Sequence, residues 1–426
     1  MPDQTVSSLS TQSVAPQRIR MSPADREILR PLAATLATFA SRPSEHAKRD
    51  LWYRHNALQP TRPLIFCDPE NGWNEIITAS HLQSQGDLAR DWEMTLRKEI
   101  FWADSMGDDK VIDAAFRVPH VYHESDWGMT HQIIKVASHG SYRWDPPLKN
   151  LDDISQLRFP TITVDRQASD NLLDLAQATF GDLLTVSRRT AWWWSLGMTR
   201  TLINLRGLSE MMLDMCDNPR QLHQLMAILR DGHLAKLDFL QTSNLLSLNN
   251  DNTYVGSGGF GFTRQLPQND FAGQVRTIDM WGFCESQETV QVSPTMFEEF
   301  VFPYQLPLVQ RFGLNCYGCC EPVHNRWHVV KRFPRLRRVS VSPWADPAKM
   351  AEYLQADYIY SLKPSPADLA APQIDEPAIR AKLRRAIEIT RGCRLEIIMK
   401  DNHTIGNNPQ NVARWCQIAR EEAQRL

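Results

Sequence analysis

Short apolar runs alternate with longer helical patterns through the C-terminal half of the chain. Such runs are typical of buried strands, and a helix between two of them usually makes the strands parallel. From residue 245 onward the apolar runs lie at residues 245–248, 277–281, 313–317, 336–342, 357–361 and 395–399. Two further runs lie upstream, at residues 111–116 and 183–187.

Eight such strands with their helices predict an α/β fold, a closed (β/α)8 TIM barrel formed by residues 109–426. A doubly wound open sheet is the alternative. That fold usually carries a Gly-x-Gly-x-x-Gly turn after an early strand. No early strand of this chain is followed by that motif, so we expect the barrel.

The residues before the repeat have a different character. Residues 1–17 are rich in Ser, Thr and Gln and lack the apolar stretch of a signal peptide, which predicts a disordered tail over residues 1–20. Residues 21–108 are mostly helical in pattern and form an expected N-terminal extension. Within them, the run at 63–67 is closed by Asp68 and Pro69 and predicts a short strand.

The overall charge and the cysteine content narrow the range of functions. The formal net charge is −2, which gives no electrostatic reason to expect nucleic acid or an anionic membrane as a partner. No apolar run approaches the roughly 20 residues of a spanning helix. Eight cysteines are too few for a disulfide scaffold in a chain this long. We therefore expect free thiols and a cytoplasmic protein.

Two clusters of metal-binding residue types follow two of the predicted strands. Cys319, Cys320 and Glu321 come after the run at 313–317, and Asp401 and His403 come after the run at 395–399. The carboxyl ends of parallel strands open on one face of a barrel, so the clusters can meet in space. Thiolate, carboxylate and imidazole are zinc ligands. These five residues are the predicted zinc site. Cys316, inside the strand, can instead be a small core residue.

Other polar side chains stand at predicted strand ends. Asn250 and Asp251 open a Gly-rich loop after residues 245–248, which suits a polar ligand but lacks the ending of a P-loop. We expect Asp251 and Lys363 to be catalytic. The expected substrate-binding residues are Asn250, Trp281, Glu285 and His139.

Two aromatic-rich stretches have open interpretations. His139 lies within residues 118–144, which hold four histidines with Trp127, Tyr142 and Trp144. They could be a lid or substrate wall, or an ordinary structural loop. Residues 192–194 are three tryptophans, which could line an apolar pocket but which we expect to pack in the core.

At these motifs the chain resembles the uroporphyrinogen decarboxylase superfamily, and in particular its decarboxylase-like members and the related zinc methyltransferases. The resemblance is good from about residue 205 to the C-terminus and loose before it. It implies a (β/α)8 barrel. The phrases that carry it are Val255-Gly-Ser-Gly-Gly259, Tyr317-Gly-Cys-Cys-Glu-Pro322, Val341-Ser-Pro-Trp344, Ser361-Leu-Lys-Pro364 and Glu396-Ile-Ile-Met-Lys-Asp401.

The resemblance also implies a chemistry. Zinc methyltransferases of this superfamily bind zinc through a His-x-Cys pair after one strand and a Cys after the last strand. Here Cys319 matches the first Cys, and Tyr317 replaces the His, so Tyr317 is counted among the catalytic residues. Asp401 and His403 lie where the last-strand Cys is expected. The Met-Arg-Gln-Ala-Gly-Arg signature of the true decarboxylases is absent, so haem synthesis is not expected.

We therefore expect a zinc-dependent methyltransferase-like (demethylase) enzyme that moves a methyl group between a small substrate, corrinoid or folate and a thiol. No Asp-x-His-x-x-Gly cobalamin signature occurs, so a corrinoid would belong to a separate partner protein. The first alternative is a metal-independent decarboxylase or other lyase that uses Lys363 and Asp251 on a small carboxylated substrate. The second is a non-catalytic barrel that binds a ligand. Formation of a homodimer is left open.

Overall fold

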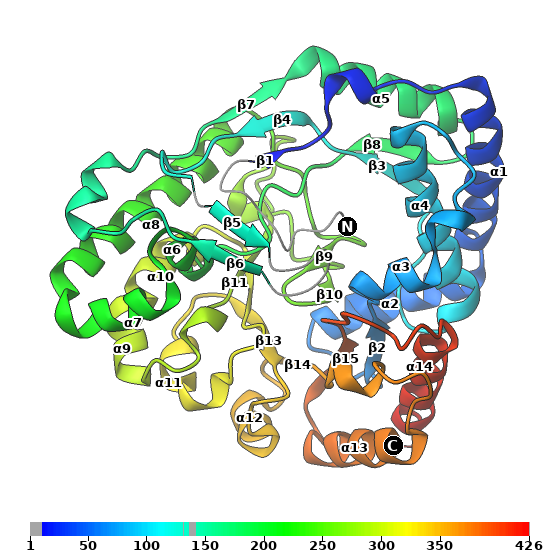
Figure 1. Ribbon diagram of the computed structural model, residues 1–426. Coiled ribbons are helices and arrows are strands. Elements are labelled where there is room, and N and C mark those ends of the chain that lie inside the picture. Colours follow the sequence, from blue (N-terminus) through cyan, green and yellow to red (C-terminus); the bar gives the residue numbers. More distant parts are fainter. Residues whose placement is uncertain (1–10, 131, 136–141, 426) are drawn as a thin grey trace.

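The computed structural model describes residues 11–130, 132–135 and 142–425, and its centre is a parallel sheet (Figure 1). Six strands pair in the order β11-β12-β13-β14-β15-β2, and every neighbouring pair is parallel. Their bounds are Trp281–Cys284 for β11, Leu314–Tyr317 for β12, Leu336–Val341 for β13, Ile359–Leu362 for β14, Arg394–Met399 for β15 and Leu64–Cys67 for β2. The predicted α/β class and parallel sheet are confirmed.

The remaining described strands form small separate sheets. β3 (Ala115–Val118) and β8 (Thr185–Arg188) make a parallel pair. The others are antiparallel: β1 (Thr11–Gln12) and β7 (Ile162–Asp165) flank β4 (Val121–Glu124), β5 (Gln132–Lys135) pairs with β6 (Tyr142–Asp145), and β9 (Tyr254–Val255) pairs with β10 (Gly259–Phe260). In the described part of the chain, backbone ladders therefore do not join eight strands into a closed ring.

The expected strand at residues 245–248 explains part of this gap. The segment forms no ladder. The Asn249 side chain accepts from the backbone N–H of Trp281 at 2.8 Å and donates to its carbonyl at 3.0 Å. A side chain thus occupies the backbone groups that a neighbouring strand would have used. The run at 277–281 also differs from the prediction, because Thr277–Asp279 is a 3₁₀ turn and the strand begins only at Trp281.

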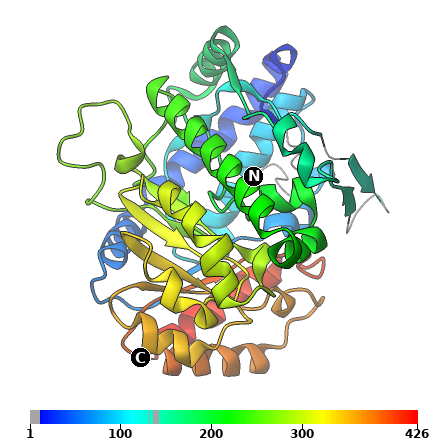
Figure 2. The same cartoon turned by 90° about the vertical axis from the view of Figure 1, so that its left-hand side faces the viewer.

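Helices lie around the outside of the strands (Figures 1 and 2). Strand alternation places them there, since Val339 and Val341 of β13 join the main core while Arg338 and Ser340 point to the other face. The longer helices after β3 are α5 (Arg166–Phe180), α6 (Thr199–Arg206), α7 (Leu208–Asp217), α8 (Pro219–Thr242), α9 (Pro294–Phe300), α10 (Phe302–Val309), α12 (Pro347–Leu354), α13 (Glu376–Ile389) and α14 (Gln410–Ala423), and α11 (Trp327–Val330) is short. No helix in the described ranges is long and apolar enough to span a bilayer.

The N-terminal region is mainly helical, as predicted, but it also completes the sheet. Its helices are α1 (Pro23–Ala40), α2 (Pro43–Asn56), α3 (Trp73–Ile76) and α4 (Asp87–Phe101). β2 lies between α2 and α3 and pairs with the last strand, β15. Residues 21–108 therefore supply a strand of the central sheet as well as helices packed beside it. Residues 1–10 lie outside the described residues. Strand β1 belongs to the segment that was expected to be a disordered tail, but it pairs with β4.

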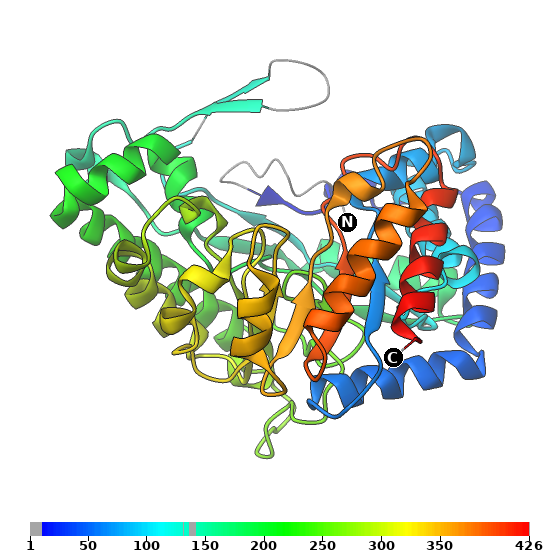
Figure 3. The ribbon, with the colours of Figure 1, turned by 90° about the horizontal axis from the view of Figure 1, so that it is seen from below.

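Helix α2 covers the amino end of the sheet. Its last residue, Asn56, donates to the carbonyls of Phe260 and Phe262, both at 2.8 Å. Its carbonyl accepts from Arg337 at the start of β13, and Arg394 at the start of β15 donates to the carbonyl of Leu58. Figure 3 shows α2 on one side of the molecule and the β5–β6 hairpin projecting from the opposite side. The amino end of the sheet is therefore covered by the N-terminal region.

Candidate functional site

The strands of the main sheet are followed by polar residues at their carboxyl ends. In α/β sheets this edge is where ligands bind. In sheet order from β11 to β2, the polar residues that follow the strands are Glu285, Cys319, Cys320, Ser342, Lys363, Lys400, Asp401 and Glu70. This edge is the candidate site.

Two adjacent thiols lie at this edge. The sulfur atoms of Cys319 and Cys320 are 3.8 Å apart, and the Cys320 sulfur is 3.9 Å from Asp401 Oδ2. Gly318, with φ +92°, makes the turn that places both cysteines at the edge. Cys319 also accepts from the Ser257 hydroxyl at 3.3 Å. The hydrogen bond with Cys320, followed by burial, raises the pKa of Cys319 well above its usual range.

The spacing of the thiols can be compared with a zinc site. Two sulfurs on one tetrahedral zinc, each about 2.3 Å from the metal, lie about 3.8 Å apart. The Cys319–Cys320 distance fits this value. However, among the described residues no three or more His, Cys, Asp or Glu side chains are grouped so as to hold a metal ion. The two thiols therefore fit two of the four ligand positions of a tetrahedral zinc site. The Asp401 carboxylate, 3.9 Å from the Cys320 sulfur, is the candidate for a third.

Two predicted ligands do not join the thiols. Glu321 is fully buried, and its carboxylate accepts from the backbone N–H groups of Ser286 at 2.8 Å and Cys319 at 2.9 Å. It holds the turn in place instead of facing the edge. His403 is exposed in the loop after β15. Asp401 takes a left-handed backbone conformation, φ +61°, just before it, which redirects the chain.

A group of charged residues surrounds Asp401. Lys400 Nζ lies 2.9 Å from Asp401 Oδ1 and 3.8 Å from Glu70 Oε1. Burial alone would lower the pKa of Lys400, but Tyr254, Cys319 and these carboxylates raise it well above its usual value. Burial raises the pKa of Glu70 to about 7. Sequence reasoning missed Glu70, although the apolar run before it was recognised as a strand.

Lys363 is buried at the end of β14, with an exposed fraction of 4%. Its Nζ donates to Ser361 Oγ at 2.6 Å, and burial lowers the pKa of Lys363 to about 7. Its predicted catalytic companion, Asp251, is engaged elsewhere. Asp251 forms a two-pronged ion pair with Arg189, at 2.9 and 2.8 Å. The Asp251 carboxylate is therefore engaged by Arg189, and the Lys363 amine by Ser361.

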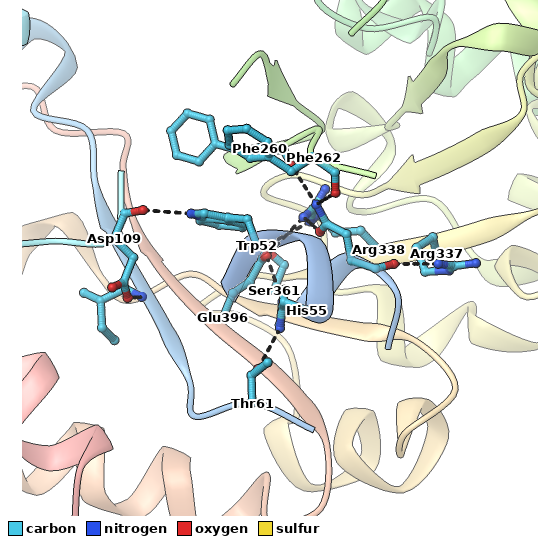
Figure 4. Close-up of polar contacts among 12 residues, drawn as sticks. Trp52, His55, Thr61, Asp109, Phe260, Phe262, Arg337, Arg338, Ser361 and Glu396 are labelled. Atoms are coloured by element: carbon cyan, nitrogen blue, oxygen red, sulfur yellow. Dashed lines mark hydrogen bonds and ion pairs between the residues drawn. The ribbon is translucent and has the colours of Figure 1, made fainter. Parts of the chain in front are cut away.

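Beneath Lys363, a buried ionic network extends to α2 (Figure 4). Glu396 of β15 accepts from Arg338 at 2.9 and 3.2 Å, from Ser361 at 2.5 Å and from His55 at 3.2 Å. Burial alone would raise the pKa of Glu396, but Arg338 and His55 lower it to about 2. Burial lowers the pKa of His55. Ser361 thus links a carboxylate that stays ionised to the Lys363 amine.

Several predicted site residues have structural roles. The Tyr317 hydroxyl bonds to Ser286 Oγ at 2.8 Å, and its ring stacks on Phe333 on the helix-facing side of β12. Trp281 is buried and donates from its indole to the carbonyl of Gly261 at 2.9 Å. The Asn250 amide donates to the carbonyl of Leu266 at 2.7 Å. Strand alternation turns Tyr317 away from the thiols, into the helix-facing core. Trp281 lies in the same buried cluster as Cys319, where its ring fills space in the core.

Glu285 does lie at the candidate edge, at the end of β11. It is buried, and its carboxyl accepts from Ser195 Oγ and from the backbone N–H of Gln287, both at 3.0 Å. Burial, together with Glu288 and Glu321, raises the pKa of Glu285 well above its usual range. Burial therefore favours the neutral form of the Glu285 carboxyl at this edge.

The Gly-rich loop packs against the sheet and does not form an open ligand-binding loop. A Cβ on Gly256 would lie 2.8 Å from Cys316 Cβ, and one on Gly259 would lie 2.5 Å from the guanidinium carbon of Arg338. The glycines therefore let the loop pack directly on the inner face of the sheet. Cys316 is buried in this packing, in agreement with its interpretation as a core residue.

The aromatic stretches are only partly assigned. His139 and His131 lie outside the described residues. His120 hydrogen-bonds to Thr190, and its ring lies 5.6 Å from that of Trp192. The Trp192 indole donates to the carbonyl of Leu245 at 2.9 Å, so this tryptophan packs in the core as expected. Trp193 is partly buried against the core, whereas Trp194 is exposed, which differs from the expectation.

Comparison with known proteins gives little support for any assignment. No protein-family model matches the chain, and no curated protein matches it. Among solved structures, a methyltransferase from Methanosarcina mazei is similar to 88% of this chain over 97% of its own length, with a TM-score of 0.49 and 12% sequence identity. A likeness at this level says nothing about the activity of this chain.

Proposed function

We propose that this protein is an enzyme that moves a methyl group to or from a thiol at the carboxyl edge of the sheet, with zinc held in part by Cys319 and Cys320. One observation carries the proposal: the two thiols are 3.8 Å apart and lie beside the Asp401 carboxylate. Two ligands of one tetrahedral zinc have this spacing. A substrate thiol would add a further ligand.

The groups around the thiols suit this chemistry. A bound zinc would keep a coordinated substrate thiol in its nucleophilic, deprotonated form at neutral pH. Lys400 compensates the charge of Asp401 at 2.9 Å. Cys319 is buried, whereas the Asp401 side chain is 41% exposed. The substrate would thus enter past Asp401 and react where water is largely excluded.

The methyl carrier is part of the proposal. The chain has no cobalamin-binding signature, so we propose that a corrinoid on a separate protein, a folate or a small methylated compound brings or takes the methyl group. A decarboxylase without metal is the weaker candidate, because Asp251 is bound to Arg189 and is not available to Lys363.

The test combines metal content with methyl transfer. Protein purified without chelators is analysed for zinc and incubated with methylcobalamin and a small thiol. We expect about one zinc per chain and methylation of the thiol. Cys319→Ala and Cys320→Ala should each lose both properties. Cys216→Ala is the matched control, because Cys216 is exposed on α7, outside the edge.

The outcomes separate the rival functions. Zinc that survives removal of both thiols would refute the proposed ligands. Release of carbon dioxide from a carboxylic acid by metal-free protein would favour the lyase. Tight ligand binding without turnover, unchanged in Cys319→Ala, would favour a non-catalytic binding protein.

A further inference from the structure

Three buried cations lie on the inner face of the sheet near the thiol pair, and two of them have a carboxylate partner. Arg338, Lys363 and Lys400 are 1%, 4% and 5% exposed. Arg338 pairs with Glu396, and Lys400 pairs with Asp401. In the part of the chain that the structure describes, Lys363 makes no ion pair. Among the described residues its amine donates one hydrogen bond, to the neutral Ser361 hydroxyl at 2.6 Å.

The network around Lys363 fixes the orientation of its amine. Ser361 donates its own proton to Glu396 Oε1 at 2.5 Å, so its oxygen is left to accept from Lys363. Glu396 is already shared by Arg338 and His55. Two of the three ammonium protons of Lys363 thus remain for another acceptor.

A buried ammonium without a counter-charge is costly, and a ligand with the opposite charge removes that cost. The charged and titratable groups that act on Lys363 are Glu396 and Cys319, which favour its charged form, and Lys400 and Arg338, which oppose it. Arg338 and Lys400 each have a carboxylate within ion-pairing distance, so Lys363 is the one of these three cations that has no ion-pair partner among the described residues.

The position of Lys363 is that of a substrate contact. Its backbone N–H donates to the carbonyl of Val341 at the end of β13, so it lies at the same edge as the residues that follow β12 and β15. Around it, exposure increases toward Glu70 and Asp401, whose side chains are 34% and 41% exposed. A ligand that enters past these carboxylates would present its far end to Lys363.

We propose that Lys363 binds a carboxylate group of the substrate, so that the site takes a small monocarboxylic acid. A single negative charge matches the single cation without an ion-pair partner, and a carboxylate oxygen accepts a charge-assisted hydrogen bond from its remaining N–H donors. The inference rests on the proposed function in one respect, because it assumes that the substrate reacts beside Cys319 and Cys320.

The experiment measures binding without turnover. Propionate and its uncharged analogue propionamide are titrated into the full chain and followed by ligand-observed NMR at pH 6. Neither compound has a thiol, so the result does not depend on zinc or on methyl transfer. We expect propionate to bind about tenfold more tightly than propionamide, the value of a charge-assisted hydrogen bond in a buried site.

Two variants test the role of Lys363. Lys363→Met and Lys363→Gln both remove the charge and should reduce the affinity for propionate to that for propionamide. Lys349→Met is the control, because Lys349 is an exposed lysine on α12, and it should keep the preference. Thermal melting checks that each variant is folded. One folded variant of the two is enough for the comparison.

Three results would overturn the inference. They are equal binding of the two compounds by the unaltered chain, a preference for propionate that persists without the Lys363 charge, and loss of the preference in Lys349→Met. Because Lys363 loses its charge as the pH rises through about 7, the preference should also be smaller at pH 8 than at pH 6. Failure of methyl transfer would refute the proposed function and leave this binding result unchanged.

Discussion

Replacement of Glu396 by Gln tests the buried network that supports the candidate site (Figure 4). The Glu396 carboxylate is fully buried and accepts from Arg338, Ser361 and His55. Glu396→Gln keeps the size of the side chain but leaves the Arg338 guanidinium buried without its counter-charge. Removing one partner of a buried ion pair costs about 3–5 kcal/mol.

The pKa of Glu396 gives a second estimate of the same quantity. Its pKa falls from 4.5 to about 2 on folding, which corresponds to roughly 3 kcal/mol of stability at neutral pH. For 426 residues that unfold as one unit, the unfolding entropy is roughly 0.9 kcal/mol per degree. Glu396→Gln should therefore lower the thermal midpoint by about 3–5 °C at pH 7, measured by calorimetry or circular dichroism.

The pH dependence has a definite sign. The folded-state pKa of Glu396 lies below its unfolded value, so its stabilising effect is complete above about pH 4.5 and is lost as the pH falls toward 2. The difference between the unaltered chain and Glu396→Gln should shrink over that range. Glu298→Gln, at an exposed pair with Arg332, should cost less than about 1 kcal/mol at any pH. Equal stability of Glu396→Gln and the unaltered chain at pH 7, or a difference that grows in acid, would refute this account.

Two further substitutions test the packing around the site. Gly259→Ala would place a Cβ 2.5 Å from the Arg338 guanidinium carbon. It should destabilise the fold by about 1–3 kcal/mol, which is measured as a lower denaturant midpoint. An unchanged midpoint would show that the loop can shift. Tyr317→Phe removes the hydrogen bond to Ser286. It should cost about 1 kcal/mol of stability and leave the rate of methyl transfer unchanged. A large loss of rate at full zinc content would instead show that Tyr317 is catalytic.

The sheet was predictable because each of its strands is apolar enough to be seen as a run. The helices between them were predictable for the same reason, since their buried sides repeat at helical spacing. The missing ladder at residues 245–248 was not predictable. Its cause is one side chain, Asn249, which bonds to both backbone groups of Trp281. An asparagine after an apolar run gives no sign in the sequence of which backbone groups it will bind.

The candidate site was predictable in its location and only partly in its members. Cys319, Cys320 and Asp401 lie together as the order of strands suggested. Glu321 is also a carboxylate in the turn after its strand, yet its oxygens accept hydrogen bonds from two backbone N–H groups. A carboxylate that caps a turn and one that faces a ligand are indistinguishable in sequence, because the difference lies in the direction of one side chain.

The buried charges give a signal that sequence reasoning could have used. Glu396 interrupts an apolar run and has buried neighbours on both sides, and Arg338 stands in a strand where every residue but Arg337 is buried. A charge cannot remain in such a place alone, because burial without a partner costs several kcal/mol. A basic residue in one inner strand therefore predicts an acidic one in another, and here they pair across β13 and β15. Lys363 stands just beyond the strand that separates them and has no carboxylate partner among the described residues. The same rule then points outside the chain, to a ligand that carries a negative charge.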